Sequence, residues 1–340
     1  MSTTFTTTRR TALAAIMAAA ALTVTQSAPA LAAPGDGVVV VEDGSALYEI
    51  TNLPALGRVY AANPWKRGSG GSDPRHHVWV VDADATKVVG KVDLGAGSAF
   101  GVAANPETNT VYATDFVFTK KVYAIDGETL KIKDEVALEA GPRGIAVNAG
   151  TKKVYTPLTS AGKLAVLNAE TLAVETTIPV GRTPVQVAVN PTNNKVYVSN
   201  VANRTTESSV TVIDGNTNTV LATVPVDAYA QGVAVHPVTN TAYVTNYAKG
   251  TVTVLDGNTN AVTGTIAVGP NPLGLEVNAR TNKAYVSHFD AAGGVSVIDL
   301  ATNTAEKFPA APNTLGLTIN PELDRVYYAS QSQARVNYLQ

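Results

Sequence analysis

The sequence predicts an all-β fold, a seven-bladed β-propeller of four-stranded antiparallel blades closed by an N-terminal strand that completes the last blade. A tyrosine followed by a short apolar-polar alternation recurs about every 42 residues, a period typical of propeller blades. The segments around it are rich in Val, Ile, Thr and Tyr, as strands prefer. After the N-terminal segment, no stretch of helical length shows a 3.6-residue apolar period. The seven tyrosines are Tyr60, Tyr112, Tyr155, Tyr197, Tyr243, Tyr285 and Tyr327.

Residues 1–33 have the pattern of a signal peptide rather than of the fold. Arg9 and Arg10 precede a mildly apolar, Ala-rich run at 11–24, and an A-x-A cleavage site places the cut near Ala32 or Ala33. The Arg pair resembles a twin-arginine signal, and the general secretory route is the alternative. We therefore expect a secreted or extracytoplasmic protein, with residues 34–340 as a single domain and no transmembrane segment.

Each repeat divides into four short strands joined by turns. In the fourth repeat these are 187–190, 197–200, 210–214 and 220–226. Asn and Pro follow most first strands, and Asp-Gly follows several third strands, so both connections have the residues of tight turns.

The two ends of the repeat region are complementary. The last repeat has only one strand, at 336–339, after its Tyr segment, whereas an apolar run at 38–41 precedes the first repeat without a partner. We expect this N-terminal run to pair with the last repeat, because the closed ring then has no open sheet edge.

Composition excludes several kinds of site. The chain has 340 residues and no cysteine, so disulfides, thiolate metal sites and cysteine nucleophiles are excluded. Its formal net charge of −2 gives no support to a basic nucleic-acid surface. We found no G-x-S-x-G, H-E-x-x-H or P-loop motif.

The repeats resemble those of the YVTN-family β-propellers, which are related to WD40-type repeats. Tyr-Val-Thr-Asn at 243–246, followed by the strand that ends at Asp256, matches the family repeat, and 197–200 and 285–288 are close variants. The resemblance covers the whole chain after the signal peptide. It implies an exported protein, and the known relatives include surface-layer proteins, a periplasmic DNA-binding protein, lactonase-like propellers and propeller subunits of amine dehydrogenases.

One face of a propeller ring, at the mouth of the channel, is the expected ligand surface. The loops that follow the second strands would place polar side chains there; these are Asn63, Asp115, Asn200, Asn246 and His288. The segments that lead into the first strands would add Arg143, Gln186 and Gln231. The alternative for the Asn residues is that they end the strand and cap the loop. Arg143 would suit a carboxylate or phosphate, or would pair with Asp115.

The longest expected loop, residues 64–77, lies in the first repeat. Trp65 and Arg67 make it a candidate lid or partner-docking segment, and a solvated insertion without a role is the alternative. Asp73, His76 and His77 are the candidate metal ligands. Neighbouring residues on a strand point to opposite faces, which argues against both histidines binding one ion.

His288 is the candidate catalytic base, and it would need a carboxylate such as Asp290 or Asp115 to orient it. Since no acid-base pair or ligand cluster accompanies it, the favoured function is an exported, non-catalytic binding propeller that acts as a monomer without a cofactor. Its partner would be a protein, a small molecule or a carbohydrate, and nucleic acid is not expected. The alternatives are a lactonase-like hydrolase or dehydrogenase-associated subunit, and a cell-surface structural or DNA-binding protein.

Overall fold

The computed structural model describes residues 38–41, 45–66, 74–202 and 206–340, with only the backbone described at Pro74 and Arg75. The expected signal peptide, Arg67 and Asp73 lie outside the described residues. No helix within the described ranges is long and apolar enough to cross a membrane.

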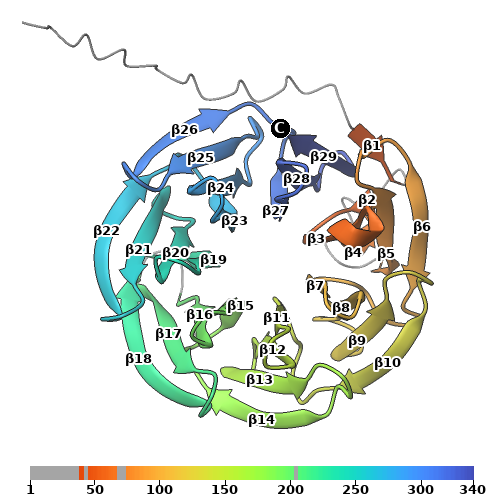
Figure 1. The fold of residues 1–340 in the computed structure, drawn as a ribbon, viewed down its shortest axis with the longest axis horizontal. Coiled ribbons are helices and arrows are strands. Elements are labelled where there is room, and N and C mark those ends of the chain that lie inside the picture. The colour runs from red at the N-terminus through yellow and green to blue at the C-terminus, as the bar shows by residue number, and fades with distance from the viewer. Residues whose placement is uncertain (1–37, 42–44, 67–73, 203–205) are drawn as a thin grey trace, which may run out of the picture. The chain divides into compact units, whose positions relative to one another are not determined.

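The described chain forms seven antiparallel sheets arranged as blades around a central axis (Figure 1), which confirms the predicted fold class. Blade 1 comprises β2 (Ser45–Ala46), β3 (Ile50–Leu53), β4 (Arg58–Lys66), β5 (Pro74–Asp82) and β6 (Val88–Asp93), with a 3-10 turn at Pro54–Leu56. Blade 2 comprises β7 (Val102–Asn105), β8 (Thr110–Thr114), β9 (Lys121–Asp126) and β10 (Ile132–Ala137). Blade 3 comprises β11 (Ala146–Asn148), β12 (Lys153–Leu158), β13 (Lys163–Asn168) and β14 (Val174–Pro179).

The same order continues around the ring. Blade 4 comprises β15 (Pro184–Asn190), β16 (Lys195–Asn200), β17 (Ser208–Asp214) and β18 (Thr219–Val226). Blade 5 comprises β19 (Ala230–His236), β20 (Thr241–Asn246), β21 (Thr251–Asp256) and β22 (Ala261–Ala267). Blade 6 comprises β23 (Pro272–Asn278), β24 (Lys283–His288), β25 (Val295–Asp299) and β26 (Thr304–Phe308). Blade 7 comprises β27 (Thr314–Asn320), β28 (Arg325–Ser330), β29 (Arg335–Leu339) and β1 (Val38–Val40).

The N-terminal strand closes the ring as predicted. Strand β1 runs antiparallel to β29, with Val39 opposite Val336, and forms the outer edge of blade 7. Val39 is buried in an apolar cluster that also contains Leu47 and Ile50 of the blade 1 region and Tyr327 of blade 7. The first described strand therefore links the two ends of the chain through both backbone pairing and core packing.

The repeated tyrosine fixes one blade to the next. Tyr60 in blade 1 donates a hydrogen bond of 2.6 Å to the carbonyl oxygen of Gly127, in a turn of blade 2. Tyr112 and Tyr327 make the equivalent bonds across their own blade boundaries, to the carbonyl oxygens of Ala169 and Ala83. These three rings also fill the apolar space between two sheets, so each of them combines burial with a satisfied hydroxyl, whereas the buried hydroxyl of Tyr197 has no partner among the described residues.

The Thr or Ser at the third motif position makes a second inter-blade bond, next to the channel. Thr245 donates to the carbonyl oxygen of Leu273 at 2.9 Å, and Ser287 donates to that of Leu315. Thr114 and Ser199 make the corresponding bonds. These hydroxyls link the inner strands of neighbouring blades.

Candidate binding site in the central channel

The inner strand of most blades is bulged where it faces the channel. The pairing of β19 with β20 shifts between Ala230 and Val233, and the inner strands of blades 4, 6 and 7 shift at the same level. In blade 1 the equivalent segment interrupts the strand between β2 and β3 and contains Tyr48 and Glu49. A bulge redirects side chains, so this level of the ring is where functional groups can enter the channel.

At this level of the ring, five blades carry glycine two residues before the residue that pairs with the motif tyrosine. These glycines are Gly101, Gly144, Gly232, Gly274 and Gly316. The blade-to-blade approach there is close, since a Cβ at Gly274 would lie 2.3 Å from the carbonyl oxygen of Leu315. Blades 1 and 4 instead carry Glu49 and Gln186 at this position. The amide of Gln186 donates to Glu49 Oε1 at 2.7 Å, so the two exceptions to the repeat contact each other in the channel.

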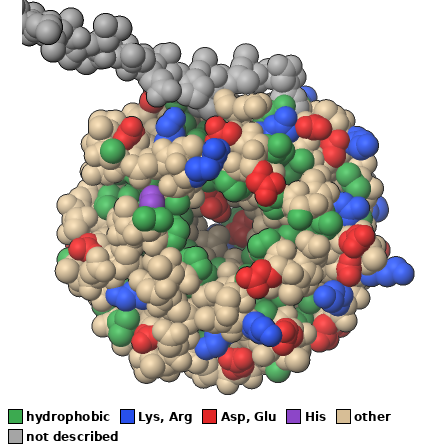
Figure 2. Space-filling model, in the orientation of Figure 1, with side chains coloured by type: hydrophobic (Ala, Val, Ile, Leu, Met, Phe, Trp, Pro, Cys, Tyr) green, Lys and Arg blue, Asp and Glu red, His purple; other side chains and the backbone are tan. Residues whose placement is uncertain are grey.

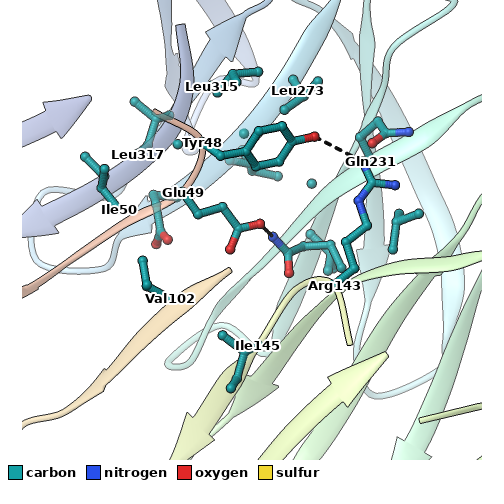
Figure 3. Close-up of a pocket in the computed structure, with 18 of the residues that line it drawn as sticks. Tyr48, Glu49, Ile50, Val102, Arg143, Ile145, Gln231, Leu273, Leu315 and Leu317 are labelled. Atoms are coloured by element: carbon teal, nitrogen blue, oxygen red, sulfur yellow. Dashed lines mark hydrogen bonds between the residues drawn. The ribbon is translucent and has the colours of Figure 1, made fainter. Parts of the chain in front are cut away.

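Arg143 lies next to this pair and enters the channel from the segment before β11 (Figure 3). Its Nη2 donates to the Tyr48 hydroxyl at 3.2 Å, and its guanidinium lies 5.6 Å from the centre of the Phe100 ring. Among the described residues, no carboxylate lies within ion-pair distance of it. Burial opposes its charge, but Tyr48 and then Glu49 favour it, and the net effect raises the pKa of Arg143.

Gln231 is the third polar group of this cluster. It is only 6% exposed and lines the same cavity, and Figure 3 shows it beside the guanidinium of Arg143 and the hydroxyl of Tyr48. Its backbone carbonyl accepts a bond from Ser199, but its side-chain amide has no hydrogen-bond partner among the described residues. The amide can both donate and accept hydrogen bonds, so its free positions at the cavity are available to a ligand or to water.

Two carboxyl groups line the cavity, on Glu49 and Glu276. Burial raises the pKa of Glu49 to about 7, although the bond from Gln186 and the charge of Arg143 lower it. Burial, and then repulsion from Glu49, raises the pKa of Glu276 to about 8. Both residues keep some surface exposed to the channel, but the surrounding blades limit their contact with bulk water. Glu276 pairs with Tyr285 in the ladder, where the other blades have only Ala or Thr.

The raised pKa of Glu276 predicts a pH-dependent effect on stability. The carboxyl ionises near 4.5 when unperturbed and near 8 in the fold, so its contribution to stability falls as the pH rises through that window. Glu276→Gln is expected to raise the free energy of unfolding at about pH 9 by at least about 1.4 kcal/mol, one pKa unit, and to change it little near pH 5. Thermal unfolding across this range measures the effect. Glu306→Gln, at an exposed position on β26, is the control, and a gain independent of pH would contradict the assignment.

The cavity bounded by these residues has a volume of about 120 Å³. Apolar side chains of the inner strands complete its wall, including Ile50, Val102, Leu275 and Leu317. Figure 2 shows the open channel mouth, with acidic side chains visible within it and apolar groups around its rim. A cavity of 150 Å³ in another protein holds a benzene molecule, so this one fits a ligand of about six non-hydrogen atoms.

The residues predicted from the loops after the second strands do not line the cavity, in contrast to Arg143, Gln186 and Gln231. Asn63, Asn200 and Asn246 are buried and use their side chains within their own blades. Asn246 donates to the hydroxyls of Thr251 and Thr253, and Asn200 donates to Thr211. Their amide nitrogens are therefore used within the blade, whereas the buried Oδ1 atoms of Asn200 and Asn246 have no partner among the described residues.

Asp115 does not pair with Arg143. It is buried and accepts hydrogen bonds from the backbone amides of Val117, Phe118 and Thr119, and it therefore caps its own loop. The guanidinium is left without the structural partner that the sequence suggested for it.

His288 is enclosed within blade 6. Its Nδ1 lies 2.6 Å from the carbonyl oxygen of Pro270, so Nδ1 carries the proton, and its Nε2 lies 2.8 Å from the hydroxyl of Ser296. Both side chains are fully buried, and burial lowers the pKa of His288. A catalytic role would require the blade to open to substrate.

The expected loop at 64–77 is shorter than predicted, because β4 continues to Lys66 and β5 begins at Pro74. Trp65 pairs with Pro74 in this extended hairpin and packs against Tyr48 at a ring distance of 6.1 Å. His76 Nδ1 lies 2.7 Å from the carbonyl oxygen of Gly97, and the His77 ring packs edge-on against Trp79. Within the described ranges, no group of three or more His, Cys, Asp or Glu residues is arranged to hold a metal.

Sequence reasoning identified Arg143, Gln186 and Gln231 but missed Tyr48, Glu49 and Glu276. Of the three missed residues, only Glu276 had a signal in the sequence. Gln186 and Glu276 each interrupt a position that is small in neighbouring repeats, and Glu276 was visible within an otherwise apolar first strand. Tyr48 and Glu49 precede the first tyrosine and lack the Gly and Asn-Pro that identify this strand elsewhere.

Comparison with known proteins supports the architecture. No family model matches the chain, and no curated protein matches it significantly. Among solved structures, it is similar to a chain of hydrazine synthase from Kuenenia stuttgartiensis, with a TM-score of 0.75, 15% identity, and coverage of 88% of this chain and 96% of that one. It is also similar to a chain of a mitotic checkpoint complex, with a TM-score of 0.75, 12% identity, and coverage of 100% and 98%. Identities this low show the β-propeller fold alone.

Proposed function

We propose that this protein is an exported, non-catalytic binding propeller of the YVTN type that holds a small anionic ligand in the mouth of its channel. The observation that carries the proposal is the guanidinium of Arg143, which lies in the channel without a carboxylate partner beside the hydroxyl of Tyr48 and the amide of Gln231. A propeller of the same fold within a mitotic checkpoint complex supports a binding role for this scaffold.

The chemistry of the cluster favours a carboxylate or a phosphate. Arginine presents five donors in a planar fork that matches these groups, and Arg143 uses only one described bond, to Tyr48. The phenol of Tyr48 and the amide of Gln231 would complete the recognition of the anion. Charge-assisted bonds in a poorly hydrated channel are stronger than neutral ones, which favours binding by a few well-placed groups.

The test is isothermal titration calorimetry with propionate and with inorganic phosphate as separate probes. Arg143→Met is expected to weaken binding of the preferred anion at least about tenfold, since hydrogen bonds to a charged group contribute roughly 1.5–3 kcal/mol. Arg182→Met makes the same chemical change at an exposed position and is expected to leave the affinity unchanged. Equal affinity in the wild type and Arg143→Met would contradict the proposal, and the two probes distinguish carboxylate from phosphate recognition.

Export gives a second prediction. When the full chain is produced in a bacterial host with a periplasm, the mature protein is expected outside the cytoplasm with an intact mass that corresponds to cleavage near Ala32 or Ala33. The uncleaved mass in the cytoplasmic fraction alone would contradict export. Replacing Arg9 and Arg10 together with Lys is expected to block a twin-arginine route and to leave a general secretory route working.

A further inference from the structure

We infer that the ligand is a zwitterion of the amino-carboxylate class, with its carboxylate at Arg143 and its ammonium group at the carboxyl groups of Glu49 and Glu276. This inference rests on the proposed function, because it places the anionic end of the ligand at the same guanidinium. The inference adds that the opposite end of the ligand is positively charged, which defines its chemical class.

The charged residues that line the cavity are Glu49, Arg143 and Glu276. Glu49 already accepts a bond from Gln186, whereas Glu276 has no hydrogen-bond partner among the described residues. Glu276 also departs from the repeat, since the other blades place Ala or Thr opposite the motif tyrosine. A carboxyl group that lines a channel without a partner, close enough to a second carboxyl to be repelled by it, is arranged to receive a cation.

Gln231 is an independent indication of a ligand in this cavity. Gln231 as a whole residue is 6% exposed and lines the same cavity as Arg143, and its side-chain amide has no hydrogen-bond partner among the described residues. An amide can donate to a carboxylate or accept from an ammonium group, so it fits either end of a zwitterion. Gln231 and the two carboxyl groups therefore offer polar groups to the same ligand.

Ligands with one charge satisfy only part of the site. A simple carboxylate would pair with Arg143 but would leave Glu276 without a hydrogen-bond partner. A simple amine would pair with the carboxyl groups and leave Arg143 without an anion. An amino carboxylate of about six non-hydrogen atoms satisfies both ends and fits the volume of about 120 Å³.

Binding of an ammonium group should also release a proton. The raised pKa values of Glu49 and Glu276 mean that the empty channel holds protons on these groups near neutral pH. A neighbouring ammonium lowers both pKa values, so a proton leaves the carboxyl group and passes to the buffer as the complex forms. Propionate offers no such cation and would not release it.

Calorimetry at pH 7 with glycine, β-alanine and 4-aminobutyrate, beside propionate and propylamine, tests the inference. The three amino acids separate their charges by one, two and three carbon atoms. The best of them is expected to bind at least about tenfold more tightly than propionate and to show heats that vary with the ionisation enthalpy of the buffer. Glu276→Gln is expected to remove this gain and to reduce the buffer dependence to the part that Glu49 contributes, while propionate still binds. Glu306→Gln is the exposed control on β26.

The outcomes separate this inference from the proposed function. If propionate binds through Arg143 and no amino acid binds more tightly, the zwitterion is excluded and the anion site stands. If an amino acid binds more tightly but Glu276→Gln leaves the gain intact, the assignment of the ammonium to this carboxyl group is wrong. If neither propionate, phosphate nor any of the amino acids binds, both the inference and the proposed function fail.

Discussion

Gly274→Ala is expected to lower the free energy of unfolding by about 3 kcal/mol, at the upper end of the usual range for inserting a methyl group into a packed site. The added Cβ would lie 2.3 Å from the carbonyl oxygen of Leu315 and 2.8 Å from the hydroxyl of Ser287. The first of these atoms is backbone and cannot rotate away, so blades 6 and 7 would have to separate at the channel. The bond between Ser287 and Leu315 would be strained by the same movement.

Gly264→Ala is the matched control, because a Cβ at Gly264 on the outer strand β22 would meet no atom within 4 Å. This change is expected to be neutral or slightly stabilising, since alanine loses less backbone entropy than glycine on folding. Thermal unfolding at one fixed scan rate compares the two variants with the parent. Equal transition temperatures for Gly274→Ala and Gly264→Ala would contradict the close approach of the inner strands.

Val39→Asp is expected to destabilise the fold by roughly 3 kcal/mol or more, because it would bury an unpaired carboxyl group in an apolar cluster. Val39 is 6% exposed and packs with Leu47, Ile50 and Tyr327. The variant is also expected to open the seam between β1 and β29, and hydrogen exchange of the Val336 region would report that opening.

Val40→Asp tests whether the effect comes from burial rather than from charge. Val40 is the next residue on the same strand and is 48% exposed, because successive side chains point to opposite faces. We expect a change within about 0.5 kcal/mol, as is usual for exposed positions. Comparable losses for Val39→Asp and Val40→Asp would mean that β1 does not pack as the closing strand.

The fold could be predicted because the turn residues within each repeat and the period of the tyrosine motif both indicate four-stranded blades. The turns illustrate this: Asn194 and Asn218 have positive φ values, and an asparagine side chain tolerates that conformation. The tyrosine period fixed the number of blades, and the unpaired N-terminal run predicted the closure that β1 makes with β29. These features depend on neighbours in sequence or on the repeat itself.

The site could be predicted only in part, because it is built from departures from the repeat. Arg143 and Gln231 were found because they are polar where an apolar strand begins. Asn200 and Asn246 also looked available, and only tertiary packing shows that hydroxyls on neighbouring strands occupy them. Glu49 could not be aligned from sequence, because blade 1 lacks the glycine that identifies this level in five other blades.

A crystal structure of the protein with whichever of glycine, β-alanine and 4-aminobutyrate binds most tightly, at a concentration well above its measured Kd, tests the central claim most directly. The account predicts density for the ligand in the channel, with its carboxylate about 2.9 Å from the guanidinium of Arg143 and within reach of Tyr48 and Gln231. An empty channel, or a ligand bound only on the outer surface of the blades, would contradict it.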